Sequence, residues 1–317
     1  MKLAFLIDHP SQLNLKKDTS LAIMKRAQDM GWECLFFTQS DLFCQQGLAY
    51  STCYSLEIDS ANPSHWAKIS SMGVRSLSDF NCILMRKDPP FNLDYIYSTY
   101  ALELAEKEGV LVANKPQSLR DANEKFFTLN FPQCCPETLV TQDISVLKNF
   151  WEEHKNVIFK PLDGMGGMSI FHVNEKGLNL SVILETLTQN QRKMIMAQVY
   201  IPEITSAGDK RILLINGKPM PYALARIPIK GELRGNLAAG ARGRVVSITE
   251  RDQWLCEQIG PTLKEKGLYF VGIDVIGDYV TEINVTSPTC LKEITEETGL
   301  DIAGELLHCL ESTYSST

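Results

Sequence analysis

Three oxygen-bearing side chains near the end of the chain form the clearest chemical pattern in the sequence. Glu282 and Asn284 are two residues apart in a predicted strand, so both side chains should share one face. Asp274 lies in the preceding predicted strand, and a turn near Gly277 and Asp278 would join the two strands as a hairpin. Oxygen ligands suit Mg²⁺, which nucleotide phosphates commonly complete. The pattern predicts a site for Mg²⁺, with Mn²⁺ as a substitute.

The register of this hairpin decides whether the third oxygen ligand joins the other two. A two-residue loop would pair Asp274 with Thr281 and turn it away from Glu282, whereas a three-residue loop with a bulge at 277–279 would place Asp274 opposite Glu282. We predict the second register. The alternative is a polar hairpin face in water, since carboxylate-rich hairpins are common on surfaces.

A lysine followed by glycines indicates a phosphate site. Lys160 precedes the segment 163–169, which is rich in glycine, and glycines let backbone N–H groups approach phosphate oxygens. The segment lacks the GKS or GKT ending of a Walker A loop. A glycine-rich turn beside a surface lysine is the alternative. Lys125, taken alone, has the pattern of a solvated lysine.

Basic residues gather in one glycine-rich stretch of an acidic chain. The segment 226–244 has one acidic residue, Glu232, and five basic ones: Arg226, Lys230, Arg234, Arg242 and Arg244. We predict a mobile loop over 227–243 that acts as a cationic lid on an anionic ligand. A solvated loop is the alternative. Arg211 could clamp a phosphoryl or acyl oxygen, or could form a salt bridge at a strand edge.

The predicted secondary structure that would position these residues differs between the first and the second part of the chain. The first part reads as β-α-β with further strands and helices, which favours a parallel sheet; the predicted elements are 3–7, 19–30, 33–37, 82–85, 95–109 and 110–112. Ligands bind such sheets at the carboxyl ends of the strands, which places Arg86 there. No GxGxxG follows the first strand, so a dinucleotide fingerprint is absent from the sequence.

The second part reads as α+β. Its predicted elements are strands 157–159, 170–173 and 194–200, the hairpin 211–215 with 220–224 turned at Asn216-Gly217, and helices 250–267 and 301–312.

Composition limits the classes of function. The chain has 317 residues, 44% hydrophobic residues and a formal net charge of −7, which argues against nucleic-acid and anionic-membrane partners. The opening apolar run stops at Asp8, too early for a signal-peptide core, and no run reaches a membrane span. Nine cysteines without a CxxC spacing favour a reducing cytoplasm over a disulfide framework or zinc cluster.

The order and the amino-acid sequences of these segments resemble those of the ATP-grasp superfamily, and specifically of its bacterial glutathione synthetase family. The resemblance runs nearly end to end and is carried by residues 84–91, 114–121, 160–167, 235–240, 270–272 and 281–290. It implies an α/β protein with a Rossmann-like, parallel-sheet domain at 1–122 that precedes the ATP-grasp part. The ATP-grasp domain itself would be α+β in two parts, a small lid subdomain at 123–203 and a catalytic subdomain at 204–317.

The resemblance also implies an activity and a set of roles. The enzyme would join glycine to γ-glutamylcysteine with ATP, through an acyl phosphate, as a cytoplasmic homotetramer. ATP would be bound by Lys125, Lys160, Gly164, Met165, Gly166, Gly167, Gln198, Tyr200, Ile201 and Asp209. Mg²⁺ would be held by Asp274, Glu282 and Asn284, the dipeptide by Arg86, Asn284, Ser287, Pro288 and Thr289, and developing charge by Arg211, Arg226 and Arg234.

Two other functions remain open on the sequence. The same fold could ligate a different acceptor amine, and a non-catalytic ATP-binding protein could share it. A pure binder has no need for the full set of charge-stabilising residues, which favours the enzyme.

Overall fold

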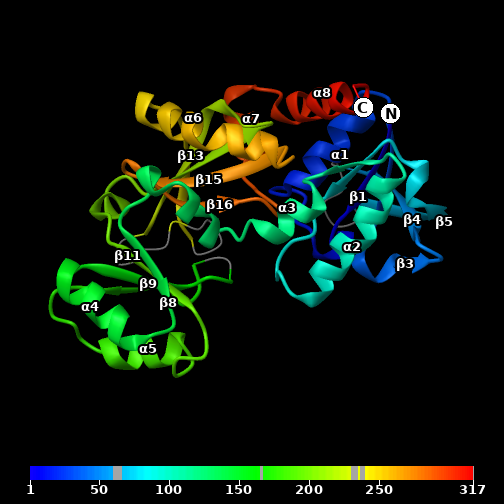
Figure 1. Ribbon diagram of the computed structural model, residues 1–317. Coiled ribbons are helices and arrows are strands. Elements are labelled where there is room, and N and C mark those ends of the chain that lie inside the picture. Colours follow the sequence, from blue (N-terminus) through cyan, green and yellow to red (C-terminus); the bar gives the residue numbers. More distant parts are fainter. Residues whose placement is uncertain (60–65, 165–166, 230–234, 236–239, 317) are drawn as a thin grey trace.

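The described part of the chain folds into three β-sheets with covering helices (Figure 1). The structure is a computed structural model, and it describes residues 1–59, 66–164, 167–229, 235 and 240–316. Within these residues no helix combines the length and the apolar character that crossing a membrane requires.

The first sheet has the strand order β3-β4-β2-β1-β6-β7, with β5 paired to β4. Its strands are β1 (Lys2–Leu6), β2 (Glu33–Phe37), β3 (Leu42–Gln45), β4 (Leu48–Ile58), β5 (Ala67–Ser76), β6 (Cys82–Met85) and β7 (Leu111–Ala113). β1, β2, β6 and β7 pair in parallel, and β3, β4 and β5 pair antiparallel. The chain runs outward from β1 in one direction and from β6 in the other. The carboxyl ends of β1 and β6 therefore form the point at which such sheets bind ligands.

The two helices predicted for this part, at 19–30 and 95–109, are confirmed to within two residues at each end, and a third, short helix was not predicted. α1 (Thr19–Asp29) is capped by the Asp18 carboxylate, which accepts from the Leu21 N–H, and Gly31 follows it with φ +78°. α2 (Leu93–Lys107) is capped by Asn92, and the short α3 (Pro116–Asp121) follows β7.

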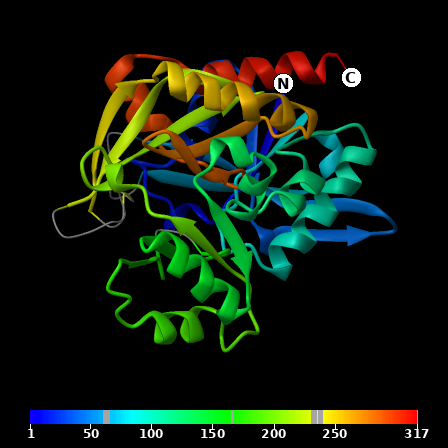
Figure 2. The same ribbon diagram turned by 60° about the vertical axis from the view of Figure 1, so that its left-hand side comes forward.

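The second sheet and its two helices form a separate lobe with its own core (Figures 1 and 2). The antiparallel order is β10-β9-β11-β8. The elements are β8 (Thr138–Thr141), α4 (Ile144–His154), β9 (Val157–Pro161), β10 (Phe171–Val173), α5 (Leu180–Leu187) and β11 (Ile195–Val199). Leu147 and Leu184 on the helices pack with Val157 and Phe159 of β9.

The third sheet is antiparallel, in the order β14-β13-β12-β15-β16, and is covered on both faces. Its elements are β12 (Asp209–Ile215), β13 (Lys218–Ile227), β14 (Arg242–Ser247), α6 (Glu250–Glu265), β15 (Phe270–Ile276), β16 (Tyr279–Asn284), α7 (Leu291–Thr298) and α8 (Ile302–Tyr314). Because side chains alternate along β12, Ile212 and Leu214 pack in the core with α6, while Leu213 and Ile215 pack with α7 and α8. The predicted Asn216-Gly217 turn is confirmed, with φ +49° and +78° at the two residues.

A buried asparagine joins the first sheet to the third. Asn114 follows β7; its Nδ2 donates to the carbonyls of Phe270 (2.8 Å) and Val285 (2.7 Å), and its Oδ1 accepts from the Phe270 N–H (2.9 Å). These bonds fix the carboxyl edge of the first sheet against the hairpin predicted to hold the metal.

The ends of the predicted loop 227–243 are wrong. β13 continues to Ile227, β14 begins at Arg242, and these two residues pair directly. The sequence prediction missed this pairing because glycine and arginine dominate the segment. Residues 230–234 and 236–239, which include Arg234, lie outside the described residues.

Candidate active site

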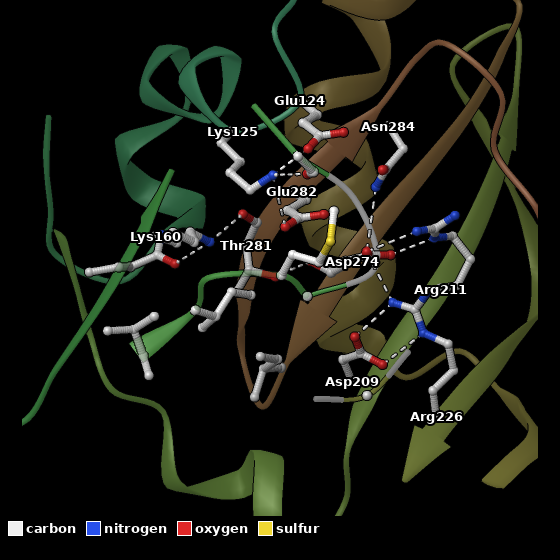
Figure 3. Close-up of a pocket in the computed structure, with 18 of the residues that line it drawn as sticks. Glu124, Lys125, Lys160, Asp209, Arg211, Arg226, Asp274, Thr281, Glu282 and Asn284 are labelled. Atoms are coloured by element: carbon white, nitrogen blue, oxygen red, sulfur yellow. Dashed lines mark hydrogen bonds and ion pairs between the residues drawn. The ribbon is translucent and has the colours of Figure 1, made fainter. Parts of the chain in front are cut away.

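A cavity of about 310 Å³ lies between the second and third sheets and collects most of the predicted site residues (Figure 3). Its walls include Lys125, Lys160, Gly164, Gly167, Gln198, Tyr200, Ile201, Asp209, Arg211, Arg226, Asp274, Glu282, Asn284, Ser287 and Thr289. Met165 and Gly166, predicted to cover the phosphates, lie outside the described residues.

The predicted register of the β15/β16 hairpin is confirmed, although its predicted cause is wrong. Asp274 pairs with Glu282 directly across the two strands. The turn has two residues, because Ile276 pairs with Tyr279, and the irregularity falls instead between Asp274 and Val275, where β16 carries the extra residue Thr281. The bulge thus rotates Glu282 to the side of Asp274, as the predicted bulge at 277–279 would have done.

Two arginines and two aspartates form a buried network on one side of the cavity (Figure 3). Arg211 binds Asp274 with two hydrogen bonds of 2.5 and 2.9 Å, and Arg226 binds Asp209 with two of 2.8 and 2.7 Å. Arg226 also lies 3.0 Å from the second Asp274 oxygen. Burial disfavours the charge on Asp274, but the two guanidinium groups outweigh it and hold its pKa below the ordinary value.

The strand alternation of β12 explains how this network faces the cavity. Asp209 and Arg211 are two apart and share one face, whereas Lys210 points to the opposite face and binds Asp252 at the start of α6. Asp209 pairs with Arg226 on β13, and Arg211 pairs with Asp274 on β15. The central strand therefore brings both ion pairs together.

The three predicted metal ligands converge, and they suit a hard divalent cation. Asn284 donates from Nδ2 to Asp274 Oδ2 at 3.4 Å, and Glu282 lies opposite Asp274 on the same hairpin. Carboxylate and amide oxygens are the donors that Mg²⁺ takes. The Asp274 carboxylate also pairs with Arg211 and Arg226, so a bound cation would share the Asp274 oxygens with these two arginines.

Two buried lysines lie on the other side of the cavity. Lys125 forms ion pairs with Glu124 and with Glu282 (3.5 Å), and its Nζ donates to the Gly164 carbonyl at 3.2 Å. Burial opposes its charge, yet Glu282 and Glu124 raise its pKa above the ordinary value. Lys160 has no carboxylate within ion-pair distance among the described residues, and burial lowers its pKa. Its Nζ donates to Gln198 Oε1 (3.1 Å) and to the Thr281 carbonyl (3.3 Å).

Glu124 and His172 lie at the site but were not predicted from the sequence. Glu124 is the acidic neighbour of Lys125, and burial followed by the charge of Glu282 raises its pKa; its place beside a predicted phosphate-binding lysine was the available signal. His172 on β10 stacks on the Tyr200 ring at 4.0 Å between centroids. Nothing in its spacing could have indicated this contact.

The residues predicted to bind the second substrate also meet. Arg86, at the carboxyl end of β6, donates from Nη2 to the Pro288 carbonyl at 2.9 Å, and its own carbonyl accepts from Ser287 Oγ at 3.3 Å. Thr289 Oγ1 lies 3.7 Å from the Cys290 sulfur in the same segment. Arg86 and Pro288 are not among the described residues that line the cavity, but their contact joins the end of β6 to the segment after β16, and Asp88, Ser287 and Thr289 of these two segments do line it.

The predicted cationic loop reaches the site at one described residue. Gly235 lines the cavity, and a Cβ added to it would lie 2.5 Å from Asp209 Oδ1. The close approach requires glycine at this position.

Fold and cavity together define an ATP-grasp protein, a class of ATP-dependent ligases. Two solved structures resemble the chain in fold. D-cycloserine synthetase DcsG has a TM-score of 0.69 at 12% identity, over 98% of this chain and 99% of that one. The ATP-grasp ligase PsnB complexed with minimal precursor has a TM-score of 0.65 at 17% identity, over 98% and 99%.

The chain belongs to the prokaryotic glutathione synthetase family. Residues 1–120 match the model of the prokaryotic glutathione synthetase N-terminal domain, and residues 124–299 match that of its ATP-grasp domain. Glutathione synthetase of Pseudomonas syringae pv. tomato is 52% identical over 98% of this chain and 97% of its own length. Glutathione synthetase of Vibrio cholerae is 52% identical over 100% of this chain and 99% of its own length. The enzyme of Coxiella burnetii is 48% identical over 100% of this chain and 98% of its own length. The predicted family and fold class are confirmed.

Proposed function

We propose that the protein is an ATP-dependent carbon–nitrogen ligase that joins glycine to γ-glutamylcysteine and releases ADP and phosphate. The observation that carries the proposal is the convergence, in one cavity, of two buried lysines, two buried arginines and a carboxylate-bearing hairpin. Full-length identity of about half to glutathione synthetases supports the choice of substrates.

The lysine side of the cavity would bind the nucleotide. Lys125 and Lys160 would contact the phosphates, and the backbone from Gly164 to Gly167 would close over them. Gln198, Tyr200 and Ile201 would border the adenine, and Asp209 would approach the ribose or the phosphates. Both lysines are buried, so a phosphate that replaces their protein partners would interact in a medium that screens charge weakly.

Asp274, Glu282 and Asn284 would hold Mg²⁺ or Mn²⁺. When bound, the ion would neutralise phosphate charge and polarise the transferred group. Lys125 lies 3.5 Å from Glu282, so the group proposed to bind phosphate is adjacent to a proposed metal ligand.

In the first step the cysteinyl carboxylate attacks the γ-phosphorus, a P–O bond forms to the carboxylate, and the bond to ADP breaks. In the second step the glycine amine attacks the acyl carbon, the C–N bond forms, phosphate leaves with the acyl oxygen, and the amine loses its proton. Arg211 and Arg226 would stabilise the charge that develops on the acyl phosphate and the tetrahedral intermediate. The loop that carries Arg234 would exclude water, which hydrolyses acyl phosphates.

Arg86, Asn284, Ser287, Pro288 and Thr289 would bind the dipeptide. Arg86 contacts the Pro288 carbonyl, which joins the end of β6 to the segment after β16, and the dipeptide would lie beside this contact.

The proposal is tested by ADP release from the purified protein with Mg·ATP and γ-glutamylcysteine, with and without glycine, followed by product mass. Glycine-dependent ADP and a tripeptide product are expected. Another amine in place of glycine would indicate the different acceptor, and tight ATP binding without ADP release under any pairing would indicate the non-catalytic function.

We infer the domain limits 1–122, 123–203 and 204–317, a cytoplasmic location and a homo-oligomer, a homotetramer by family resemblance. The exposed strand β5 supports an oligomer, since it carries the exposed apolar side chains of Ile69, Met72 and Val74 at the end of the first sheet. Light scattering of the purified protein tests the mass.

A further inference from the structure

Two aromatic rings from residues far apart in the sequence stack beside the cavity. The centroids of the His172 and Tyr200 rings are 4.0 Å apart, and the angle between the ring planes is 19°. Tyr200 lines the cavity, whereas His172 is not among the described residues that line it. The proposed reaction therefore assigns no role to His172, although His172 contacts a residue that is proposed to border the adenine.

The strand register places both rings on the cavity face of the second sheet. His172 on β10 pairs with Ile158 on β9, and Ile158 pairs with Gln198 on β11. Residues directly opposite each other share a face of the sheet, and so do residues two apart in a strand. His172 therefore shares the face of Ile158 and Gln198, and Tyr200 follows Gln198 by two residues. Ile158, Gln198 and Tyr200 all line the cavity.

The position of the stack along β9 assigns it to the base and not to the phosphates of a nucleotide. The glycine-rich segment that is proposed to close over the phosphates follows Pro161, the last residue of β9, and Lys160 precedes Pro161. Ile158, which pairs with His172, lies near the start of the strand. His172 and Tyr200 would therefore act at the adenine.

The buried side of the His172 ring has no hydrogen bond to orient it. Nε2 of His172 is buried and has no hydrogen-bond partner within the described part of the chain. Burial lowers the pKa of His172, so the ring is neutral near pH 7. A buried ring nitrogen without a partner is uncommon in a purely structural position and requires an explanation. The contact with the Tyr200 ring supplies one.

We propose that His172 is a positioning residue for the nucleotide, which holds the Tyr200 ring as a wall of the adenine site before ATP binds. A tyrosine side chain without this contact would lose rotamer freedom when the base binds, and the stack removes that cost in advance. A stacked aromatic pair favours one orientation of the ring by roughly threefold to tenfold. The assignment rests on the proposed function and adds to it a residue that sets the affinity for the base.

Three single variants, one double variant and one control separate this role from a structural one. His172→Phe keeps an aromatic ring and removes the unpaired nitrogen, whereas His172→Leu removes the ring. Tyr200→Leu removes the stacking partner, and its combination with His172→Leu measures the coupling between the two residues. Phe171→Leu is the matched control, because Phe171 precedes His172 on β10, faces the other side of the sheet and is 36% exposed.

Calorimetry measures the dissociation constants of Mg·ATP and of Mg·tripolyphosphate, which has the phosphates but no base, without γ-glutamylcysteine or glycine. His172→Leu should weaken the binding of ATP by roughly threefold to tenfold and leave the binding of tripolyphosphate unchanged. His172→Phe and Phe171→Leu should leave both unchanged. In the Tyr200→Leu background, His172→Leu should have no further effect. In the ligation assay, His172→Leu should raise KM for ATP by the same factor with kcat unchanged.

Equal weakening of ATP and tripolyphosphate by His172→Leu would overturn the proposal, because it indicates a distorted lobe. Unchanged ATP binding in His172→Leu, a loss in His172→Phe, or an undiminished loss in the Tyr200→Leu background would also overturn it. Failure of the proposed function would appear separately, as a wild type that binds Mg·ATP but does not ligate glycine, and the calorimetry then still decides the role of His172. A wild type that does not bind ATP would overturn both proposals.

Discussion

Asp274→Asn should destabilise the protein strongly, because it leaves a buried positive charge without a partner. Asp209, Arg211, Arg226 and Asp274 carry no net charge together, and their side chains are at most 14% exposed. Removal of one partner from a buried ion pair costs about 3–5 kcal/mol. We expect a loss of that size in the free energy of unfolding, measured by urea titration without nucleotide.

Glu282→Gln is the matched control on the same hairpin. Glu282 is 21% exposed in its side chain and lies 3.5 Å from Lys125, which keeps Glu124 as a second partner. Its loss should cost no more than about 1 kcal/mol. Both variants remove a proposed metal ligand, so both should lose ATP turnover. Only Asp274→Asn should lose stability.

A compensating change and the pH dependence sharpen the test. Arg211→Met combined with Asp274→Asn removes one charge of each sign and leaves the Arg226–Asp209 pair, so the double variant should recover part of the stability. Because the folded pKa of Asp274 is depressed, its stabilisation is complete above the unfolded pKa, about 3.9, and is lost as the pH falls below it. Asp274→Asn should lack this acid-side slope. Equal stability losses in Asp274→Asn and Glu282→Gln, or no recovery in the double variant, would refute the reasoning.

Three further changes test other parts of the structure. Lys160→Met should raise KM for ATP about tenfold or more. Because burial lowers the pKa of Lys160, the wild type should gain stability as the pH rises toward about 10, and the variant should lose this gain. If the free energy of unfolding rises with pH equally in both proteins, the prediction is contradicted. Gly208→Ala should lower the free energy of unfolding by more than about 2 kcal/mol, because its Cβ would lie 2.3 Å from the Arg226 carbonyl oxygen. Gly109→Ala has a similar positive φ but open space around the Cβ, so it should lower the free energy of unfolding by only about 1–2 kcal/mol. Equal losses for the two variants in urea titration would contradict the reasoning. Asn114→Ala should cost about 3 kcal/mol in the same titration, because three buried backbone groups lose their partner, and a loss under 1 kcal/mol would be inconsistent with that linkage.

The β15/β16 hairpin, which is proposed to hold a metal ion, shows how far local sequence could predict the site. Spacing placed Glu282 and Asn284 on one face, and the requirement that Asp274 join them selected the correct register. The bulge position was beyond prediction, because a bulge at 277–279 and one at Thr281 give the same pairing of Asp274 with Glu282. Only the packing around the hairpin distinguishes them.

The arginine–aspartate network could not be predicted from turn chemistry. The Asn216-Gly217 turn pairs Ile215 with Lys218, and that register continued along the strands would pair Asp209 with Leu224. An irregularity between Ile212 and Leu214 shifts the pairing, so that Asp209 meets Arg226. The register shifts by an even number of residues, so each side chain stays on the same face of the sheet and only its partner on the neighbouring strand changes.

The N-terminal sheet shows a different limit. The buried strands β1, β2 and β6 are continuous apolar runs and were predicted nearly to the residue. β5 was missed because it is exposed along almost its whole length and carries lysine, arginine, serine and glycine in place of an alternating pattern. Pairing with β4 holds it in the sheet, and no local pattern indicates that pairing.

The pairing of charges in the cavity explains how a proposed ligand-binding site with so many charged groups can be buried in the free protein. In the free protein the cations Lys125, Arg211 and Arg226 each have a carboxylate partner, which offsets the cost of burial. Lys160 is different, because its partners among the described residues are neutral and burial lowers its pKa. An incoming phosphate would therefore gain most at Lys160, where it replaces no existing ion pair, and would have to compete with Glu124 and Glu282 at Lys125. Glu124→Gln should therefore tighten the binding of ATP in the absence of metal, because the phosphate then competes with one carboxylate fewer at Lys125. Lys160→Met should weaken the binding of ATP. Calorimetry with ATP in EDTA measures both effects.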